Sequence, residues 1–140
     1  MKTLRTLAVV ISFSFVLIAC SKELQKGEYR GTFSGNHPEG PYTTTYDFTI
    51  TQSKKTELKL MEKKSGTTST LTKHPNDSIS GMIGFAGQIY NPGKDGNSSF
   101  HAIKVEGTYS SNTITGRFFT TFLYEDNELE ATGDFVIKPM

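Results

Sequence analysis

The chain has 140 residues, which is enough for one domain with a packed core. Its 15 Lys and Arg residues balance 14 Asp and Glu residues, so no basic excess exists to hold a nucleic acid backbone, and nucleic acid is not expected as a partner. The single cysteine, Cys20, excludes an intramolecular disulfide, and stability must therefore come from the core.

The first element in chain order is a cationic start followed by an apolar run. Lys2 and Arg5 precede an uncharged stretch over residues 6–19. This pattern is typical of a secretory signal peptide, and the apolar run is shorter than the ~20 residues that a membrane-spanning helix needs. We therefore expect residues 1–19 to be cleaved after export.

The apolar run ends in Leu17-Ile18-Ala19-Cys20, which resembles the lipobox of bacterial lipoproteins. A small residue before the cut suits the signal peptidase, and an unpaired cysteine in an exported protein requires a role. The resemblance implies that Cys20 becomes the lipid-bearing N-terminus and that its acyl chains anchor the protein in a membrane. Ser21 follows in place of the aspartate that retains enterobacterial lipoproteins at the inner membrane. The analogy therefore implies the outer membrane, with either of its faces left open.

A brief polar tether, residues 20–26, separates the anchor from the domain over residues 27–140. The six residues after Cys20 span at most ~20 Å, so the domain is expected close to the membrane surface. Cleavage also removes Lys2 and Arg5, which changes the formal net charge from +1 to −1.

Period-two alternation runs through almost all of the mature domain, among residue types that favour strands. Short turn sequences interrupt it and favour antiparallel neighbours in chain order. Longer loops are expected at 35–41 and 91–97. The expected strands are eight: about 28–34, 42–52, 56–62, 67–73, 78–90, 99–109, 112–124 and 128–138.

A five-residue pattern recurs along these strands: an apolar residue, any residue, glycine, any residue and a second apolar residue. Its glycines are Gly31, Gly81, Gly107, Gly116 and Gly133. Glycine weakens a strand, so its repeated use indicates a geometric need. A small closed barrel supplies that need, because its strands bend and small residues lie beside large ones inside. We therefore predict an all-β fold: an antiparallel up-and-down meander that closes into a barrel of ~8 strands.

The segment Gly27-Glu28-Tyr29-Arg30-Gly31-Thr32-Phe33 resembles the first strand of small lipocalin-like, calycin-type barrels found in lipoproteins of the Bacteroidetes. Gly133-Asp134-Phe135, in the last expected strand, resembles the Gly-x-Phe of their closing strand. The resemblance is one of architecture and spans residues 27–138. Lipocalins usually carry Gly-x-Trp on the first strand, but this chain has no tryptophan, so it also lacks the biotin-stacking tryptophans of avidins.

Residues that commonly carry chemistry are few. His37 and His74 each precede a proline and show no metal-ligand spacing, so both are expected as solvated turn residues. No nucleophile elbow is present, and most carboxylates lie at turn or outward positions. We therefore expect no enzyme activity, no catalytic residue, no metal and no cofactor, and an enzyme is the least favoured of three functional classes.

The inner face is expected to be aromatic and essentially without charge. Its members are Tyr29, Phe33, Tyr46, Phe48, Ile83, Phe85, Tyr109, Phe118, Phe122 and Phe135. Such a lining either packs solid or encloses an apolar pocket. For a pocket, the ligand-binding candidates are Tyr46, Phe85, Tyr109 and Phe118, with His101 near the rim to bind a polar head group. For a filled core, the alternative is an interaction or inhibitor protein that binds a protein or glycan through the two long loops.

Overall fold

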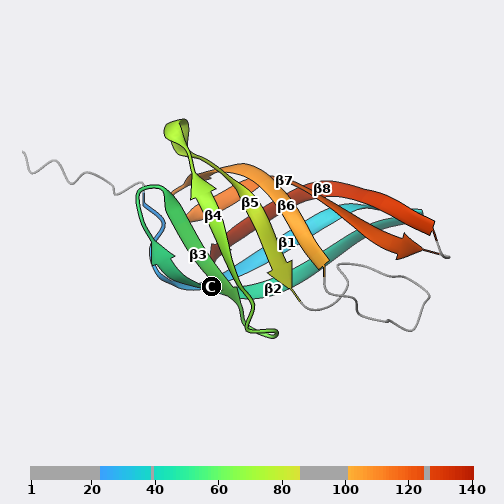
Figure 1. The fold of residues 1–140 in the computed structure, drawn as a ribbon, viewed down its shortest axis with the longest axis horizontal. Coiled ribbons are helices and arrows are strands. Elements are labelled where there is room, and N and C mark those ends of the chain that lie inside the picture. Colours follow the sequence, from blue (N-terminus) through green and yellow to red (C-terminus); the bar gives the residue numbers. More distant parts are fainter. Residues whose placement is uncertain (1–22, 39, 86–100, 125–126) are drawn as a thin grey trace, which may run out of the picture.

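The computed structural model describes residues 23–38, 40–85, 101–124 and 127–140, without the side chains of Phe85, His101 and residues 122–124. It is a closed antiparallel barrel in which each strand pairs with the next in sequence and β8 pairs with β1 (Figure 1). The strands are β1 (Gly27–His37), β2 (Gly40–Ser53), β3 (Glu57–Glu62), β4 (Thr68–Lys73), β5 (Ser78–Phe85), β6 (His101–Ser110), β7 (Thr113–Tyr124) and β8 (Asn127–Pro139). The predicted all-β class and the closed meander are confirmed.

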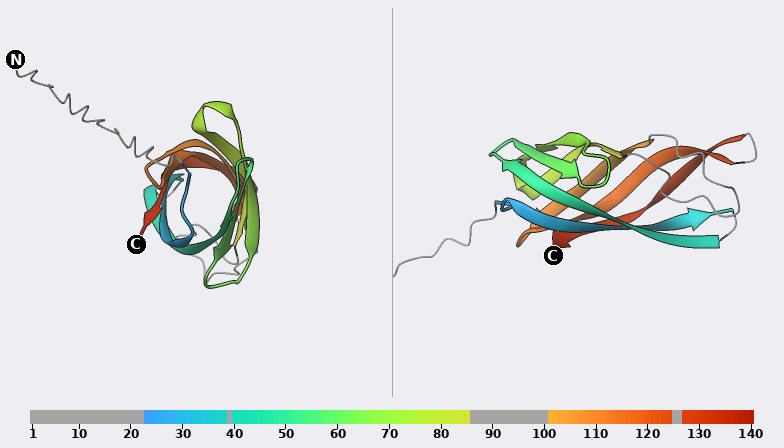
Figure 2. Two further views of the ribbon diagram at one scale, coloured as in Figure 1. Left: turned by 90° about the vertical axis from the view of Figure 1, so that its left-hand side faces the viewer. Right: turned by 90° about the horizontal axis from the view of Figure 1, so that it is seen from below.

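One end of the barrel, here called the base, holds the starts of β1, β3, β5 and β7 and the ends of the other four strands. The opposite end is called the mouth. Figure 2 shows that the β1–β2 and β7–β8 hairpins extend farther toward the mouth than β3 and β4 do. A short 3₁₀ helix, η1 (Pro75–Asp77), connects β4 to β5 at the base.

The expected loop at 35–41 is wrong, because most of it belongs to a long β1–β2 hairpin. The ladder between these strands runs on to His37↔Gly40. Glycine and proline suggested a break in the strand. However, β2 pairs with β3 toward the mouth just as far as Phe48↔Glu62, so Pro41 lies beyond that ladder, and a proline is tolerated where no neighbouring strand needs its N–H. The other expected loop, 91–97, lies outside the described residues.

The interior has two walls of different composition. The inner faces of β3 to β6 are mainly aliphatic: Leu58, Leu60, Leu71, Ile79, Ile83, Ile103 and Val105. The other four strands supply the large buried rings: Tyr29, Phe33, Tyr42, Phe48, Phe118 and Phe135. The ring of Phe33 lies 5.7 Å from those of Phe118 and Phe135 and 5.9 Å from that of Tyr46, measured between centroids. These rings pack against one another at distances typical of aromatic pairs.

The inward glycines lie where neighbouring strands come closest. Gly116 pairs with Phe135, and Gly133 pairs with Phe118, so small residues do lie beside large ones as predicted. A Cβ added at Gly116 would collide with the carbonyl oxygen of Glu106. At Gly133 it would collide with the carbonyl oxygen of Ser34. The strands therefore approach too closely there for any side chain.

Candidate functional site

Two of the predicted interior residues, Tyr46 and Phe118, lie around the same ring. Both contact Phe33, at 5.9 and 5.7 Å between ring centroids. Phe118 and Phe33 are fully buried, so no space large enough for a water molecule touches either ring. Tyr46 remains half-buried, and burial raises the pKa of its hydroxyl. This part of the interior is therefore filled around Phe118 and less tightly covered around Tyr46.

Tyr109 lies apart from this cluster, near the base. It pairs with Ile114 close to the β6–β7 turn, and the ammonium of Lys73 lies 5.4 Å from its ring centroid. Phe85 and His101 are backbone partners in the β5–β6 ladder. The structure does not describe their side chains. The structure thus brings together just two of the predicted residues whose side chains it describes.

The expectation of an interior essentially without charge is wrong, because Glu62 and Lys73 are buried. They are 3% and 5% exposed and end the two strands of the β3–β4 hairpin, Glu62 at the mouth and Lys73 at the base. The period-two pattern did indicate that both side chains point inward. Glu62 shares a strand face with buried Leu58 and Leu60, and Lys73 shares one with buried Ser69 and Leu71. Both charges sit at a strand end, where polar groups are within reach.

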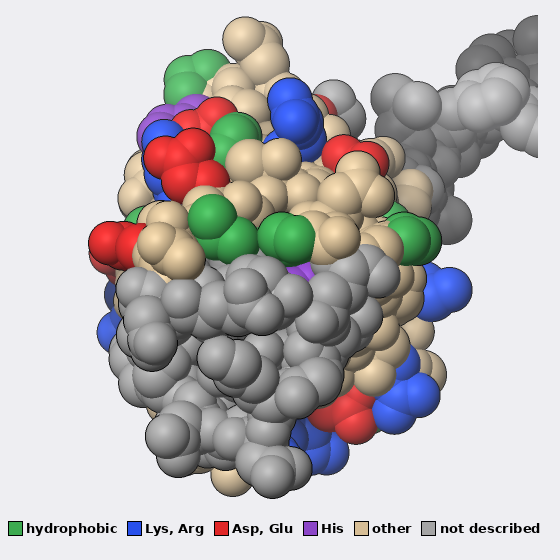
Figure 3. Space-filling view, turned by 90° about the vertical axis from the view of Figure 1, so that its right-hand side faces the viewer, with side chains coloured by type: hydrophobic (Ala, Val, Ile, Leu, Met, Phe, Trp, Pro, Cys, Tyr) green, Lys and Arg blue, Asp and Glu red, His purple; other side chains and the backbone are tan. Residues whose placement is uncertain are grey.

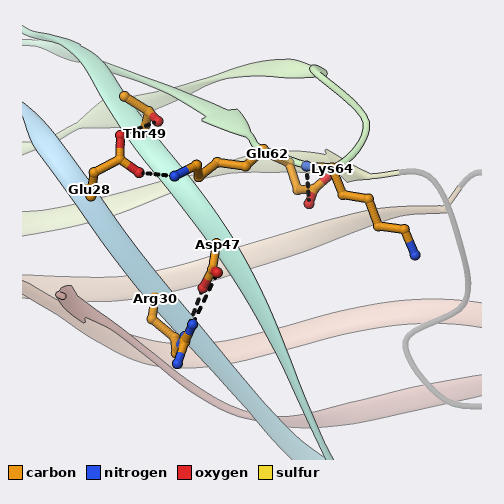
Figure 4. Close-up of polar contacts among 7 residues, drawn as sticks. Glu28, Arg30, Asp47, Thr49, Glu62 and Lys64 are labelled. Carbon is orange, nitrogen blue, oxygen red and sulfur yellow. Dashed lines mark hydrogen bonds and ion pairs between the residues drawn. The ribbon is translucent and has the colours of Figure 1, made fainter.

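Glu62 caps the turn that follows it. Its carboxylate accepts a hydrogen bond from the backbone N–H of Lys64 at 3.0 Å (Figure 4). It accepts a second from the backbone N–H of Ser65 at 2.7 Å. Burial acts to raise the pKa of this carboxyl, but the bonds from Ser65 and Lys64 outweigh it, and the net pKa is lowered. The group is thus held as a charged structural acceptor rather than as a proton donor.

Lys73 has a different environment at the base. Its Nζ donates to Ser53 Oγ at 2.8 Å and lies over the ring of Tyr109. Burial lowers the pKa of this amine, and the nearby charge of Glu23 opposes that shift. A cation over an aromatic face with one hydroxyl acceptor is a stable way to bury a lysine at the edge of a core.

The expectation that His37 is a solvated turn residue is also wrong. His37 is 7% exposed and continues the inward parity of β1 into the long hairpin. Tyr42 on the facing strand is likewise buried, which raises the pKa of its hydroxyl to about 12. By contrast, His74 is exposed, with its Nε2 2.7 Å from Ser80 Oγ.

An open groove lies on the outer wall where β6 and β7 separate. The β6–β7 ladder ends toward the mouth at Lys104↔Phe119. Beyond that point β6 stays with β5, and β7 stays with β8 as far as Tyr124↔Asn127. The groove has a volume of about 310 Å³ and is lined by Met82, Ala102, Phe119, Thr120, Thr121, Glu130, Ala131 and Thr132.

The groove combines apolar surface with a few polar groups. Met82 is 50% exposed and offers the groove an accessible apolar side chain. The ring of Phe119 is flanked by Lys104 Nζ at 5.9 Å and Arg117 Cζ at 5.8 Å from its centroid. Glu130 is the single carboxylate among the lining residues. Such a site can cover an apolar surface and orient it by hydrogen bonds.

The sequence analysis did not predict this groove, because it considered the inner face and the long loops but not the outer faces of the strands. A signal was present, since Met82 follows Gly81 and Phe119 follows Phe118, each at an outward position of its strand. Figure 3 views the molecule from its mouth end and shows hydrophobic side chains among charged ones on that face. Apolar residues at outward positions indicate a binding surface where they gather in one place, as Met82 and Phe119 do in this groove.

Metal ligands are not assembled among residues 23–38, 40–85, 101–124 and 127–140, which contain no group of three His, Cys, Asp or Glu side chains placed to hold an ion. The same part of the chain has no helix of sufficient length and apolar character to cross a membrane. Comparison with protein-family models, curated proteins and solved structures yields no match.

Proposed function

We propose that the protein is a lipid-anchored, non-catalytic binding protein of the outer membrane that holds a small ligand with an apolar face in the groove between β6 and β7. The observation that carries this proposal is the groove itself. It combines a volume of about 310 Å³ with exposed Met82 and the Phe119 ring. That volume is at the lower end of the range that small-molecule pockets occupy.

The packing of the interior favours the outer groove over the inside of the barrel. An eight-stranded barrel is barely wide enough for side chains to fill it. Here the rings of Phe33, Phe48 and Phe118 are 0% exposed. A ligand between them would have to displace a buried ring, whereas the described residues that line the groove leave it open.

The groove is tested by binding of an apolar fluorescent probe to the mature chain carrying Cys20→Ser. Phe119→Ser is expected to weaken binding about tenfold, because the loss of one buried ring face costs at least ~1.4 kcal/mol. Val136→Ser is the control, since Val136 is an apolar residue on the outer wall, as the half-buried Phe119 is, but lies away from the groove. Equal weakening by both variants, or none by Phe119→Ser, would refute the groove as the binding site.

The lipid anchor is tested separately. Cys20→Ala is expected to abolish incorporation of a fatty-acid probe during growth and to release the protein from the membrane fraction. Ser21→Ala, at the adjacent position, should leave both unchanged. Undiminished label in the Cys20 variant would rule out this residue as the lipid attachment site.

A second candidate is an apolar ligand inside the barrel, which the half-buried state of Tyr46 beside Phe33 favours. Native mass spectrometry of the protein purified from its host distinguishes the two. A bound apolar mass that survives Phe119→Ser but is lost on Phe118→Asp, in a protein that remains folded, would support the interior. A mass lost on Phe119→Ser supports the groove.

A further inference from the structure

The segment that precedes β1 is part of the folded base. Leu24 is 2% exposed and belongs to the core. The backbone N–H of Gln25 donates to Asn112 Oδ1 at 3.0 Å, and the Tyr29 hydroxyl donates to the Gln25 carbonyl at 2.8 Å. Residues that the sequence assigns to a tether therefore hold a fixed place on the barrel from Leu24 onward.

Two features of the base strengthen this attachment. Asn112 is the second residue of the tight two-residue turn between β6 and β7 and has a left-handed backbone, φ 62°. This turn fixes the position of its side chain. The charge of Glu23 also acts on the buried ammonium of Lys73. The chain is thus held at its first described residues by an apolar contact, two hydrogen bonds and an electrostatic attraction.

The length that remains free is short. Four Cα steps separate Cys20 from Leu24, and an extended chain covers at most ~14 Å in that length. We infer that the base of the barrel is a membrane-facing surface that rests on phosphate-bearing lipid headgroups, with the barrel axis rising from the bilayer. This inference depends on the lipid anchor proposed above.

The composition of the base suits such a contact. Lys26 at the start of β1 and Lys54 and Lys55 in the β2–β3 turn are exposed. Met140 is 59% exposed, and its backbone N–H donates to the Glu28 carbonyl at 3.1 Å, which fixes the C-terminus beside β1. In Figure 1 the β2–β3 turn lies at the same end as the start of the described chain. Lysine side chains reach headgroup phosphates while their stems cover apolar surface.

The acidic residues of the base are less available. Glu57 and Asp77 are half-buried. Glu23 is exposed but interacts with Lys73. The groove lies higher, because Phe119 is six residues along β7 from the base, which is ~15 Å above it for a tilted strand. A ligand would therefore bind in the groove above the layer of lipid headgroups.

Energy transfer to the membrane tests this orientation in the full lipidated protein. The protein is placed in vesicles of phosphatidylethanolamine and phosphatidylglycerol that contain a headgroup acceptor dye. A donor is attached at Ser111→Cys, in the exposed turn at the base, or at Glu128→Cys, near the mouth end of β8. Acylated Cys20 does not react with the label. We expect transfer from Ser111→Cys to exceed transfer from Glu128→Cys at least ~2-fold, given the length of the barrel.

A variant that frees the chain provides the control. A long flexible Gly/Ser insert after Ser21 leaves the barrel unchanged and should reduce transfer from the base label toward that of the mouth label. Leu24→Asp should do the same by releasing the segment, provided that circular dichroism shows a folded barrel.

Equal transfer from the two labels in the lipidated, uninserted protein would overturn the orientation and leave the anchor intact. Loss of all membrane association together with the fatty-acid label would instead refute the anchor. The two failures are therefore distinguishable in the same preparation.

Discussion

The close approach of strands at the inward glycines leads to a prediction that separates side-chain from backbone crowding. At Gly31 a Cβ would lie 2.7 Å from Phe48 Cε2 and 3.0 Å from Phe33 Cε2, and both of these atoms belong to rings. Overpacking by one methyl group lowers the free energy of unfolding by ~1–3 kcal/mol. Alanine also restricts the unfolded chain more than glycine does, which offsets ~0.4–1 kcal/mol of that loss. Gly31→Ala should therefore destabilise the barrel by ~1–2 kcal/mol, or ~4–8 °C in Tm.

Because the obstacle at Gly31 is a ring, a smaller neighbour should relieve it. Phe48→Leu alone should lower the free energy of unfolding by ~1 kcal/mol. The double variant Gly31→Ala/Phe48→Leu should be ~1 kcal/mol more stable than the sum of the two single losses predicts. Gly133 differs, since its Cβ would meet the Ser34 carbonyl oxygen as well as Phe118 Cε1 at 2.7 Å. Gly133→Ala should cost ~3 kcal/mol, and Phe118→Leu should not rescue it.

Urea unfolding of the mature chain, followed by circular dichroism, measures all of these differences. Thr115→Val, an outward and exposed position of β7, serves as the control and should change stability by no more than ~0.5 kcal/mol. The reasoning is refuted if Gly31→Ala leaves the midpoint unchanged, or if Phe118→Leu rescues Gly133→Ala as well as Phe48→Leu rescues Gly31→Ala.

Three further predictions concern the base, the mouth and the β3–β4 turn. Leu24→Ala should lower the free energy of unfolding by ~2 kcal/mol, while the control Lys26→Ala changes it by less than ~0.5 kcal/mol. An unchanged free energy of unfolding for Leu24→Ala would show that the segment before β1 is not part of the core. Burial raises the pKa of Tyr42 to about 12, so the unfolded state ionises first and stability should fall as pH rises from ~10 to 12, by up to ~2–3 kcal/mol. Tyr42→Phe should make that slope shallower in alkaline unfolding curves and leave the part that the raised pKa values of Tyr29 and Tyr46 contribute, and an unchanged slope would contradict the assignment. The lowered pKa of Glu62 contributes stability above ~pH 4.3 that is lost as pH falls, so Glu62→Gln should flatten the acid limb of the stability curve, measured by urea unfolding at each pH.

The sequence by itself determined the fold class, the strand order and the inward face of the apolar core residues, such as Phe33, Phe118 and Phe135. Period-two alternation is a local property of extended backbone, so it predicts orientation without knowledge of the partner strand. The recurrent glycines predicted closure for the same reason, because a bend in one strand is encoded within five residues. The motif around Cys20 also depends on local sequence alone, and the anchor it implies remains a proposal.

The tertiary structure decided what lies next to what. Whether Gly35 and Pro41 end a strand depends on how far β1 and β2 stay paired and on where β3 leaves β2, and no local pattern contains that register. The burial of Glu62 and Lys73 depends on the caps and hydrogen-bond partners that neighbouring segments bring to each end of the barrel. The groove exists because β6 and β7 separate at Lys104↔Phe119, and Leu24 joins the core because the β6–β7 turn places Asn112 beside Gln25. Each of these features arises from contacts between segments distant in sequence, which are set by packing of the whole barrel rather than by local preference.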